Sequence, residues 1–371
     1  MSLDGFRADY LERGLTPTLD SLARAGVRAQ WMTPSFPSKT FPNHYTLVTG
    51  LLPDHHGVIA NNMWDDSLGA FSMSNRAAVQ DARWWGGEPI WVTAETQGRR
   101  ASAFFWPGSE APIMGVYPTH WMAFDDNFPG PARVDSVLAW LDVPDAERPA
   151  FSTLYYSDVD HAGHSLGPVA PGSDSAIARV DSMLALLTSG LQRRGLAGKV
   201  NLIVVADHGM SAVSRDRLIA LDDYIPLDSV MVIDWNPVAM IQPRGSVESI
   251  YRALRGAHPN LHVYRKSELP AHFRFGTNPR IPDIVAIADD GWTITSRARF
   301  ATFNRGGEHG FDQTTPSMRA LFVASGPAFR QGVVVPPFSN IHVYELMTHI
   351  TGLNPAPNDG SLDSVRVMLR Q

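Results

Sequence analysis

The sequence predicts an α/β fold in which a central sheet is covered by helices on both faces. Short β-rich runs alternate with helical stretches along the chain, and polar clusters follow directly after two of these runs. No repeat or low-complexity tract interrupts this order. Alternating strands and helices are typical of layered α/β proteins, whose ligands sit beyond the carboxyl ends of the strands. The pattern therefore predicts both the fold class and the edge of the sheet at which a site should lie.

The helices are predicted from apolar residues at helical spacing and from their end signals. The first stretch has an N-cap-like Thr16, then Pro17, and Gly26 lies near its end, which together indicate a helix. Helices are predicted at residues 16–27, 134–141, 175–191, 247–254 and 343–350. Strands are predicted between them at residues 152–156, 200–206, 230–234, 284–287 and 320–324, because these short runs are rich in apolar and β-branched side chains.

Composition excludes several classes of protein. The 371 residues are 44% hydrophobic and 18% charged, as in folded globular proteins, and we find no convincing domain boundary. A net charge of -6 argues against a general nucleic-acid binder, which uses a basic surface. The absence of cysteine excludes disulfides, thiolate metal sites and cysteine nucleophiles. The apolar runs are too short to cross a bilayer, and the N-terminus lacks the basic and apolar regions of a signal peptide.

A carboxylate and an imidazole, Asp207 and His208, follow the predicted strand at residues 200–206. They lie at the carboxyl end of a buried strand, where α/β proteins place their ligand-binding sites. The alternative is an N-cap aspartate beside a surface histidine. These two residues alone do not decide between the two interpretations.

A second polar cluster follows the predicted strand at residues 152–156 and favours the functional interpretation. Asp160 and His164 are four residues apart, so both side chains can converge on one point if they share a helical turn. Both residue types are good ligands for a borderline divalent ion such as zinc. His161 is expected to point elsewhere at this spacing, and the role of Asp158 stays ambiguous.

Two further polar residues lie beside glycines, namely Asp4 before Gly5 and His309 in the glycine-flanked loop at residues 305–310. Each of them alone is more often a turn residue than a ligand. Together with the two clusters they complete a set of three aspartates and three histidines at loops. Six ligands are what two metal ions need if each ion keeps an open position for substrate.

A proline-rich segment, residues 34–50, leads into a predicted helix with Pro42 in its first turn, where a missing N–H is tolerated. Thr40 then lies at the helix N-terminus, where free N–H groups and the helix dipole favour an anion or an alkoxide. The alternative role for Thr40 is that of an N-cap. The neighbouring hydroxyl groups that compete with it are those of Thr33, Ser35 and Ser38.

Six short segments form a specific set: DGFR at residues 4–7, PSKTFPNH at 37–44, GLLPDHHG at 50–57, DHAGHSLGP at 160–168, DHGM at 207–210 and GEHG at 307–310. They closely resemble the nucleotide pyrophosphatase/phosphodiesterase family of the alkaline phosphatase superfamily. The likeness runs on to residues 354–360 and so covers nearly the whole chain. It implies an alkaline-phosphatase-like three-layer α/β/α sandwich with a central, mostly parallel sheet, in a single phosphodiesterase catalytic domain over residues 1–371.

The resemblance implies two Zn²⁺ ions per chain and a threonine nucleophile. One ion would be held by Asp160, His164 and His309. The other would be held by Asp4, Asp207 and His208, with Thr40 as a further ligand and as the nucleophile. Only three residues precede Asp4, where family members have a buried strand, so we expect part of that strand to be missing from the sequence.

The implied activity is hydrolysis of nucleotide phosphodiester and pyrophosphate bonds, which releases nucleoside 5′-monophosphates through a nucleotidyl-threonine intermediate. The expected partners are nucleoside triphosphates, dinucleotides and nucleotide diesters, not a specific nucleic-acid sequence. Asn61 matches the family residue that hydrogen-bonds a phosphate oxygen. The residues that match the substrate pocket are Phe41, Phe124 and Tyr155. Phe124 lies in an insertion at residues 107–128, which nucleotide-cleaving members share and the lysophospholipase D branch lacks.

Counting charges helps to choose the substrate. Two Zn²⁺ ions contribute four positive charges, the three aspartates remove three, and a Thr40 alkoxide removes the last. A near-neutral site suits a diester, which carries one negative charge at the reacting phosphate. A dianionic monoester would need an extra cation, whereas Asn61 is neutral.

Two alternatives stay open. A lysophospholipid phosphodiesterase of the same family shares every metal ligand. An inactive metal-binding homologue would keep the fold, although neither Thr40 nor any ligand position is replaced. A sulfatase is disfavoured because its nucleophile is a modified cysteine or serine. Since the family is secreted or anchored outside the cell, we expect a periplasmic or extracellular location.

Overall fold

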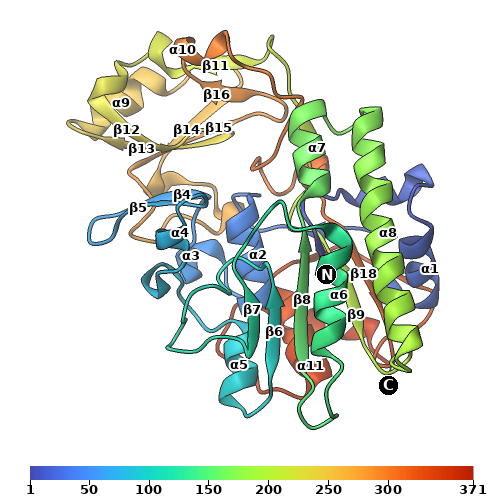
Figure 1. Cartoon of the computed structure of the whole chain (residues 1–371). Coiled ribbons are helices and arrows are strands. Elements are labelled where there is room, and N and C mark those ends of the chain that lie inside the picture. Colours follow the sequence, from blue (N-terminus) through green and yellow to red (C-terminus); the bar gives the residue numbers. More distant parts are fainter. Residues whose placement is uncertain (371) are drawn as a thin grey trace.

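An eight-stranded sheet forms the centre of the computed structural model, which describes residues 1–370 (Figure 1). Its order is β19-β2-β18-β9-β1-β8-β6-β7. Neighbours pair in parallel except at β18, which is antiparallel to both β9 and β2. The strands are β1 (Ser2–Leu3), β2 (Val27–Ala29), β6 (Ala101–Phe104), β7 (His120–Met122), β8 (Phe151–Tyr156), β9 (Leu202–Val205), β18 (Phe322–Ser325) and β19 (Val333–Val335). The mostly parallel sheet confirms the predicted fold class.

Helices cover both faces of this sheet (Figure 1). One layer holds α1 (Pro17–Ala25), α6 (Gly130–Trp140) and α8 (Pro171–Arg193), and the other holds α2 (Thr40–Thr49), α5 (Ile90–Thr96) and α11 (His342–Thr351). The long helix α8 shows why these segments are helical. Pro171 opens it, where its missing N–H costs nothing. The buried side chains Ile177, Val180, Leu184, Leu187 and Leu191 recur at helical spacing along one stripe that packs inward.

Two of the five predicted strands do not belong to the central sheet, which corrects the interpretation of the alternating pattern. Residues 230–234 and 284–287 lie in a second, four-stranded antiparallel sheet. It consists of β12 (Val230–Asp234), β13 (Val238–Pro243), β15 (Ile284–Ala288) and β14 (Leu261–Arg265), and with α9 (Val247–Leu254) it encloses an apolar core of its own. We call this sheet and α9 the second lobe. The single catalytic domain over residues 1–371 stays a prediction.

The predicted insertion at residues 107–128 is tied into the main fold. It contributes β7, which pairs with β6 at the edge of the central sheet. The buried guanidinium of Arg133 donates to the carbonyl oxygens of Asp126 at 3.1 Å, Phe128 at 3.0 Å and Tyr155 at 3.1 Å. The stretch is therefore held against the end of β8. Among residues 1–370, no helix is long and apolar enough to cross a membrane.

Candidate metal centre and active site

Three neighbouring parallel strands, β9, β1 and β8, end at one edge of the central sheet. Asp4 follows β1 directly, Asp207 follows β9, and Asp160 lies in the first turn of α7 (Asp158–Leu166) after β8. All three carboxylates are buried. No helix begins at Asp207, because β9 is followed by the short strand β10 (Ser211–Ala212). Its Oδ1 instead accepts from the Gly5 N–H at 3.2 Å, and His208 is fully buried. The N-cap alternative for this pair is therefore wrong.

The first predicted ligand trio comes together around Asp160. Its Oδ1 lies 3.4 Å from Nε2 of His164 and 3.5 Å from Nε2 of His309. Two ligands of a tetrahedral zinc ion, each about 2.0–2.1 Å from the metal, lie about 3.3 Å apart. The four-residue spacing on α7 thus does bring Asp160 and His164 together, as predicted. His161 points elsewhere, as also predicted, with a 58% exposed side chain.

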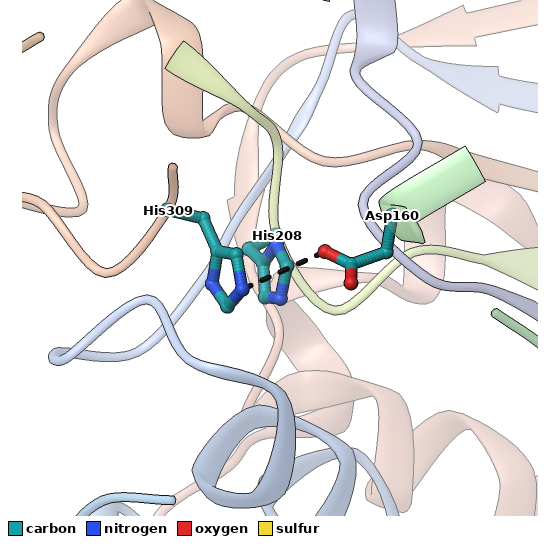
Figure 2. A group of neighbouring side chains, drawn as sticks. All are labelled: Asp160, His208 and His309. Carbon is teal, nitrogen blue, oxygen red and sulfur yellow. Dashed lines mark ion pairs between the residues drawn. The ribbon is translucent and has the colours of Figure 1, made fainter. Parts of the chain in front are cut away.

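The second predicted trio surrounds Nε2 of His208. This nitrogen lies 3.4 Å from Oδ1 of Asp4 and 2.9 Å from Oδ2 of Asp207. The hydroxyl oxygen of Thr40 lies 3.3 Å from the same nitrogen. The two trios adjoin, because the His208 and His309 rings stack with centroids 3.6 Å apart. Figure 2 shows these two rings and Asp160 facing one another. Asp160, His208 and His309 thus form a close group that crosses the two predicted trios, and the division of the six ligands between two ions stays a prediction.

A hydrogen bond from Nδ1 orients each of the three histidine rings among the predicted ligands. Nδ1 donates to a backbone carbonyl in each case: His164 to Gly307 at 3.0 Å, His208 to Gly209 at 2.8 Å and His309 to Ser38 at 2.9 Å. A proton on Nδ1 leaves the lone pair on Nε2. Nε2 of each ring faces a buried aspartate, so each ring can present this nitrogen to a metal ion. Nδ1 of His164 also lies 3.6 Å from Oε1 of Glu308.

The carboxylates also fit a bound cation. Within residues 1–370, Oδ1 of Asp4, Oδ1 of Asp160 and Oδ2 of Asp207 are buried without a hydrogen-bond partner, an arrangement that is costly without compensation. Burial, together with the charges of Asp207 and Asp160, raises the pKa of Asp4 well above its usual range. Divalent cations bound beside these oxygens would pair with them and offset the repulsion. The residues present therefore fit a metal centre.

Burial and the neighbouring His208 and His164 hold the pKa of His309 well below its usual range. His309 is therefore neutral, as a metal ligand must be. Burial acts to raise the pKa of Asp207, but the attraction of His208 and His44 outweighs it and lowers the pKa. Asp207 is therefore ionised, and it can ligate without first losing a proton. Burial acts to lower the pKa of His208, but the attraction of Asp207 outweighs it and raises the pKa, so His208 would release a proton when it binds a metal ion.

His44 and Tyr155 contact the predicted ligands and support them. The His44 Nδ1 lies 2.9 Å from the Thr40 carbonyl and 3.2 Å from Oδ2 of Asp207, and its Nε2 accepts from the Ser2 hydroxyl at 2.8 Å. Tyr155, predicted only as a pocket residue, donates its hydroxyl to Oδ2 of Asp4 at 2.6 Å. Sequence reasoning missed His44, although it stands four residues after Thr40, the spacing at which helical residues meet.

The structure separates Thr40 from the hydroxyls that compete with it. Thr40 is the first residue of α2, the N-cap is Lys39, and no side chain caps the helix, so the N-cap alternative for Thr40 is wrong. The Ser35 hydroxyl donates to Oδ1 of Asn340 at 2.8 Å, and that of Ser38 donates to the Phe311 carbonyl at 2.9 Å. Thr33 lies in the separate short strand β3 (Met32–Thr33).

The predicted substrate-binding residues border this cluster. The Asn61 Oδ1 accepts from the Phe41 N–H at 2.9 Å, which orients the amide so that its NH₂ group can donate to a ligand. Phe41 is mostly buried, whereas Phe124 is 37% exposed. The Phe124 ring lies 6.0 Å from that of Tyr155, which in turn holds Asp4. The structure thus places an exposed aromatic side chain next to the residues that support the carboxylates.

Comparisons with known proteins agree with this geometry. A family model described as type I phosphodiesterase / nucleotide pyrophosphatase matches residues 1–312. Ectonucleotide pyrophosphatase/phosphodiesterase family member 3 of Bos taurus is 39% identical over 100% of this chain and 43% of its own length. A venom phosphodiesterase of Naja atra is 41% identical over 100% of this chain and 46% of its own length. The chain thus spans a little under half the length of these relatives.

Solved structures show the same fold. Murine ectonucleotide pyrophosphatase/phosphodiesterase 5, as an inactive threonine-to-alanine variant in complex with AMP, has a TM-score of 0.95 and 36% sequence identity. The match covers 100% of this chain and 98% of that chain. The human counterpart has a TM-score of 0.96 at 36% identity, with the same coverage.

Proposed function

Because the chain belongs to the type I phosphodiesterase / nucleotide pyrophosphatase family, we propose that it hydrolyses nucleotide phosphodiester and pyrophosphate bonds and releases nucleoside 5′-monophosphates. The observation that carries the proposal is the position of Thr40. Its hydroxyl lies 3.3 Å from Nε2 of His208, beside buried carboxylate oxygens that lack partners within residues 1–370. A hydroxyl in this place is suited to act as a nucleophile.

We propose two Zn²⁺ ions as the cofactor. Asp160, His164 and His309 would hold one ion, and Asp4, Asp207 and His208 would hold the other, with Thr40 beside the second. Three imidazole nitrogens among the donors favour zinc over magnesium, which prefers oxygen ligands. When bound, the ions supply positive charge that lowers the pKa of a hydroxyl and stabilises phosphate oxygens.

The chain's own residues define the rest of the mechanism. The Thr40 hydroxyl gives up its proton and its oxygen attacks the phosphorus in line with the leaving group. A P–O bond to Thr40 forms while the bond to the leaving oxygen breaks, and the leaving oxygen departs with the electron pair and a proton from solvent where it needs one. The amide NH₂ of Asn61 donates to a non-bridging phosphate oxygen and holds the phosphate in place. Water then attacks the same phosphorus, releases the nucleoside 5′-monophosphate and returns the Thr40 hydroxyl.

We expect phosphodiesters to be preferred over phosphomonoesters. The proposed metal site is near neutral, and two cations that flank it, Lys39 and Arg305, are already paired with Asp234 and Glu308. The extra negative charge of a monoester dianion would therefore lack a partner. We expect kcat/KM for p-nitrophenyl-TMP to exceed that for p-nitrophenyl phosphate by at least about tenfold, or about 1.4 kcal/mol. A larger value for the monoester would contradict the proposed charge balance.

Phe124 is proposed to stack on the nucleobase. Because base stacking contributes about 1–3 kcal/mol, Phe124→Ala should raise KM for nucleotide substrates roughly 5- to 150-fold. The KM for bis-p-nitrophenyl phosphate, which has no base, should change little. Tyr117→Ala is the matched control, since Tyr117 lies in the same stretch, is 42% exposed and stacks on Trp121. Equal losses on both substrates would show that Phe124 supports the fold only.

The same assays address the lysophospholipid alternative. Residues 107–128 are tied to β6 through β7, so single substitutions are more informative than excision of the stretch. Choline release from lysophosphatidylcholine that exceeds nucleotide turnover would move the assignment to that branch.

We also propose a periplasmic or extracellular location, because the matched relatives are named as ecto-enzymes and venom enzymes.

A further inference from the structure

One carboxylate of the second lobe touches both chain segments that carry the proposed reacting groups. Asp234, at the end of β12, accepts from Nζ of Lys39 through Oδ2 and from Nδ2 of Asn62 through Oδ1, the latter at 3.1 Å. Lys39 immediately precedes Thr40, and Asn62 immediately follows Asn61. Asp234 therefore links the segment of the nucleophile to the segment of the phosphate-binding amide.

This link is buried. The side chains of Lys39 and Asp234 are 4% and 9% exposed. Taking two charges out of water is costly, and a buried pair is weak support for stability by itself. If one partner is removed, the other is left as an uncompensated buried charge. A pair of this kind beside a proposed active site therefore suggests a role in arranging that site.

Local backbone features orient the Asp234 side chain. The pairing of β12 with β13 shifts register between Val232 and Asp234, and such an irregularity re-aims a side chain. The Trp235 N–H donates to Oδ1 of Asp234 at 3.1 Å and fixes the carboxylate.

The Lys39 stem is confined in turn by Gly310, the neighbour of His309. A Cβ at Gly310 would lie 2.7 Å from Cδ of Pro237 and 3.0 Å from Cε of Lys39. Gly310 also has a φ of +111°, which disfavours a larger residue. The Lys39 stem therefore has close neighbours on the side of the proposed ligand His309.

We propose that Asp234 is a positioning residue for phosphoryl transfer. Through Lys39 and Asn62 it holds the Thr40 hydroxyl and the Asn61 amide at the separation that one phosphate group requires. The proposal rests on the proposed function. Asp234 acts through its neighbours, and a misplacement of about 1 Å at a reacting group costs roughly a hundredfold in rate. Removal of the link should therefore lower kcat more than it changes KM.

The test compares Asp234→Asn, Lys39→Met and the double variant, using p-nitrophenyl-TMP turnover, metal content and Tm. Each single variant should lose roughly 10- to 100-fold in kcat, with KM within about threefold of wild type and metal content unchanged. The double variant removes both buried charges, so its Tm should recover relative to the single variants while kcat stays low. Recovery of kcat together with Tm would show that the pair is merely structural and would overturn the proposal.

Asp283→Asn is the matched control in the same lobe. Asp283 accepts from Nε2 of Gln242 at 2.8 Å, and the variant should keep wild-type kcat. Wild-type kcat in Asp234→Asn, or loss of metal in parallel with activity, would also overturn the proposal. Turnover of the wild-type protein distinguishes failure of the proposed function from failure of the positioning role. If the wild-type protein does not hydrolyse p-nitrophenyl-TMP, the proposed function is wrong. If it does, and the variants keep wild-type kcat, only the positioning role of Asp234 is wrong.

Discussion

Thr40→Ala is expected to lower kcat for nucleotide diesters by at least roughly a thousandfold, while the fold and the bound metal persist. The reason is that the Thr40 hydroxyl, 3.3 Å from Nε2 of His208, is the proposed nucleophile. The helix should survive the change, because Thr40 is not the N-cap of α2 and no side chain caps this helix. Steady-state turnover of p-nitrophenyl-TMP, with metal content and circular dichroism of the same sample, measures the effect.

Ser38→Ala is the matched control for Thr40→Ala. Ser38 lies two residues earlier, and its hydroxyl is already used in a hydrogen bond to the Phe311 carbonyl. Its loss should cost about 1 kcal/mol of stability and leave turnover near that of the wild type. If Thr40→Ala keeps wild-type turnover, the nucleophile is instead Ser38 or a water molecule, and the proposed covalent intermediate is wrong.

Asp160→Asn is expected to reduce the metal content from the proposed two ions to about one per chain and kcat by at least about a hundredfold. The Asp160 Oδ1 lies within 3.5 Å of two histidine nitrogens and lacks a hydrogen-bond partner within residues 1–370. An amide in its place removes the negative charge that balances a divalent ion. Elemental analysis of the purified variant, with turnover of the same sample, tests this expectation.

Asp158→Asn provides the control for this loss of metal. Asp158 lies on the same helix, and its carboxylate contacts Arg179 at 3.4 Å. The variant should keep both ions and its activity. Two ions in Asp160→Asn, or loss of an ion in Asp158→Asn, would contradict the assigned ligands.

The local pattern of the sequence predicted much of this architecture. The apolar runs that became β8 and β9 stand out, and the polar residues just after them line one edge of the sheet. The pattern predicts that the second-lobe segments β12 and β15 are strands but places them in the wrong sheet, because a local pattern does not reveal a strand's partner. β1 has only two residues, which is too short for any periodicity.

The rest of the site depends on contacts between distant residues. Lys39 and Asp234 are 195 positions apart, and neither has a local feature that points to the other. Apart from the family resemblance, the local sequence does not separate Thr40 from Ser35 and Ser38, because the hydrogen-bond partners of these serines, Asn340 and Phe311, come from the far end of the chain. The local sequence pattern thus identifies the types of site residue and the strand ends that carry them. The contacts between side chains distant in sequence become visible only in the folded structure.

Partitioning of the nucleotidyl group between water and methanol tests the central claim most directly. In mixtures of water and methanol, a nucleotidyl-Thr40 intermediate would yield TMP and its methyl ester in a fixed ratio. This ratio should be the same for p-nitrophenyl-TMP and for thymidine triphosphate, because both substrates pass through the same intermediate after their leaving groups have departed. A product ratio that changes with the leaving group would show that water attacks the substrate directly and would contradict the role assigned to Thr40.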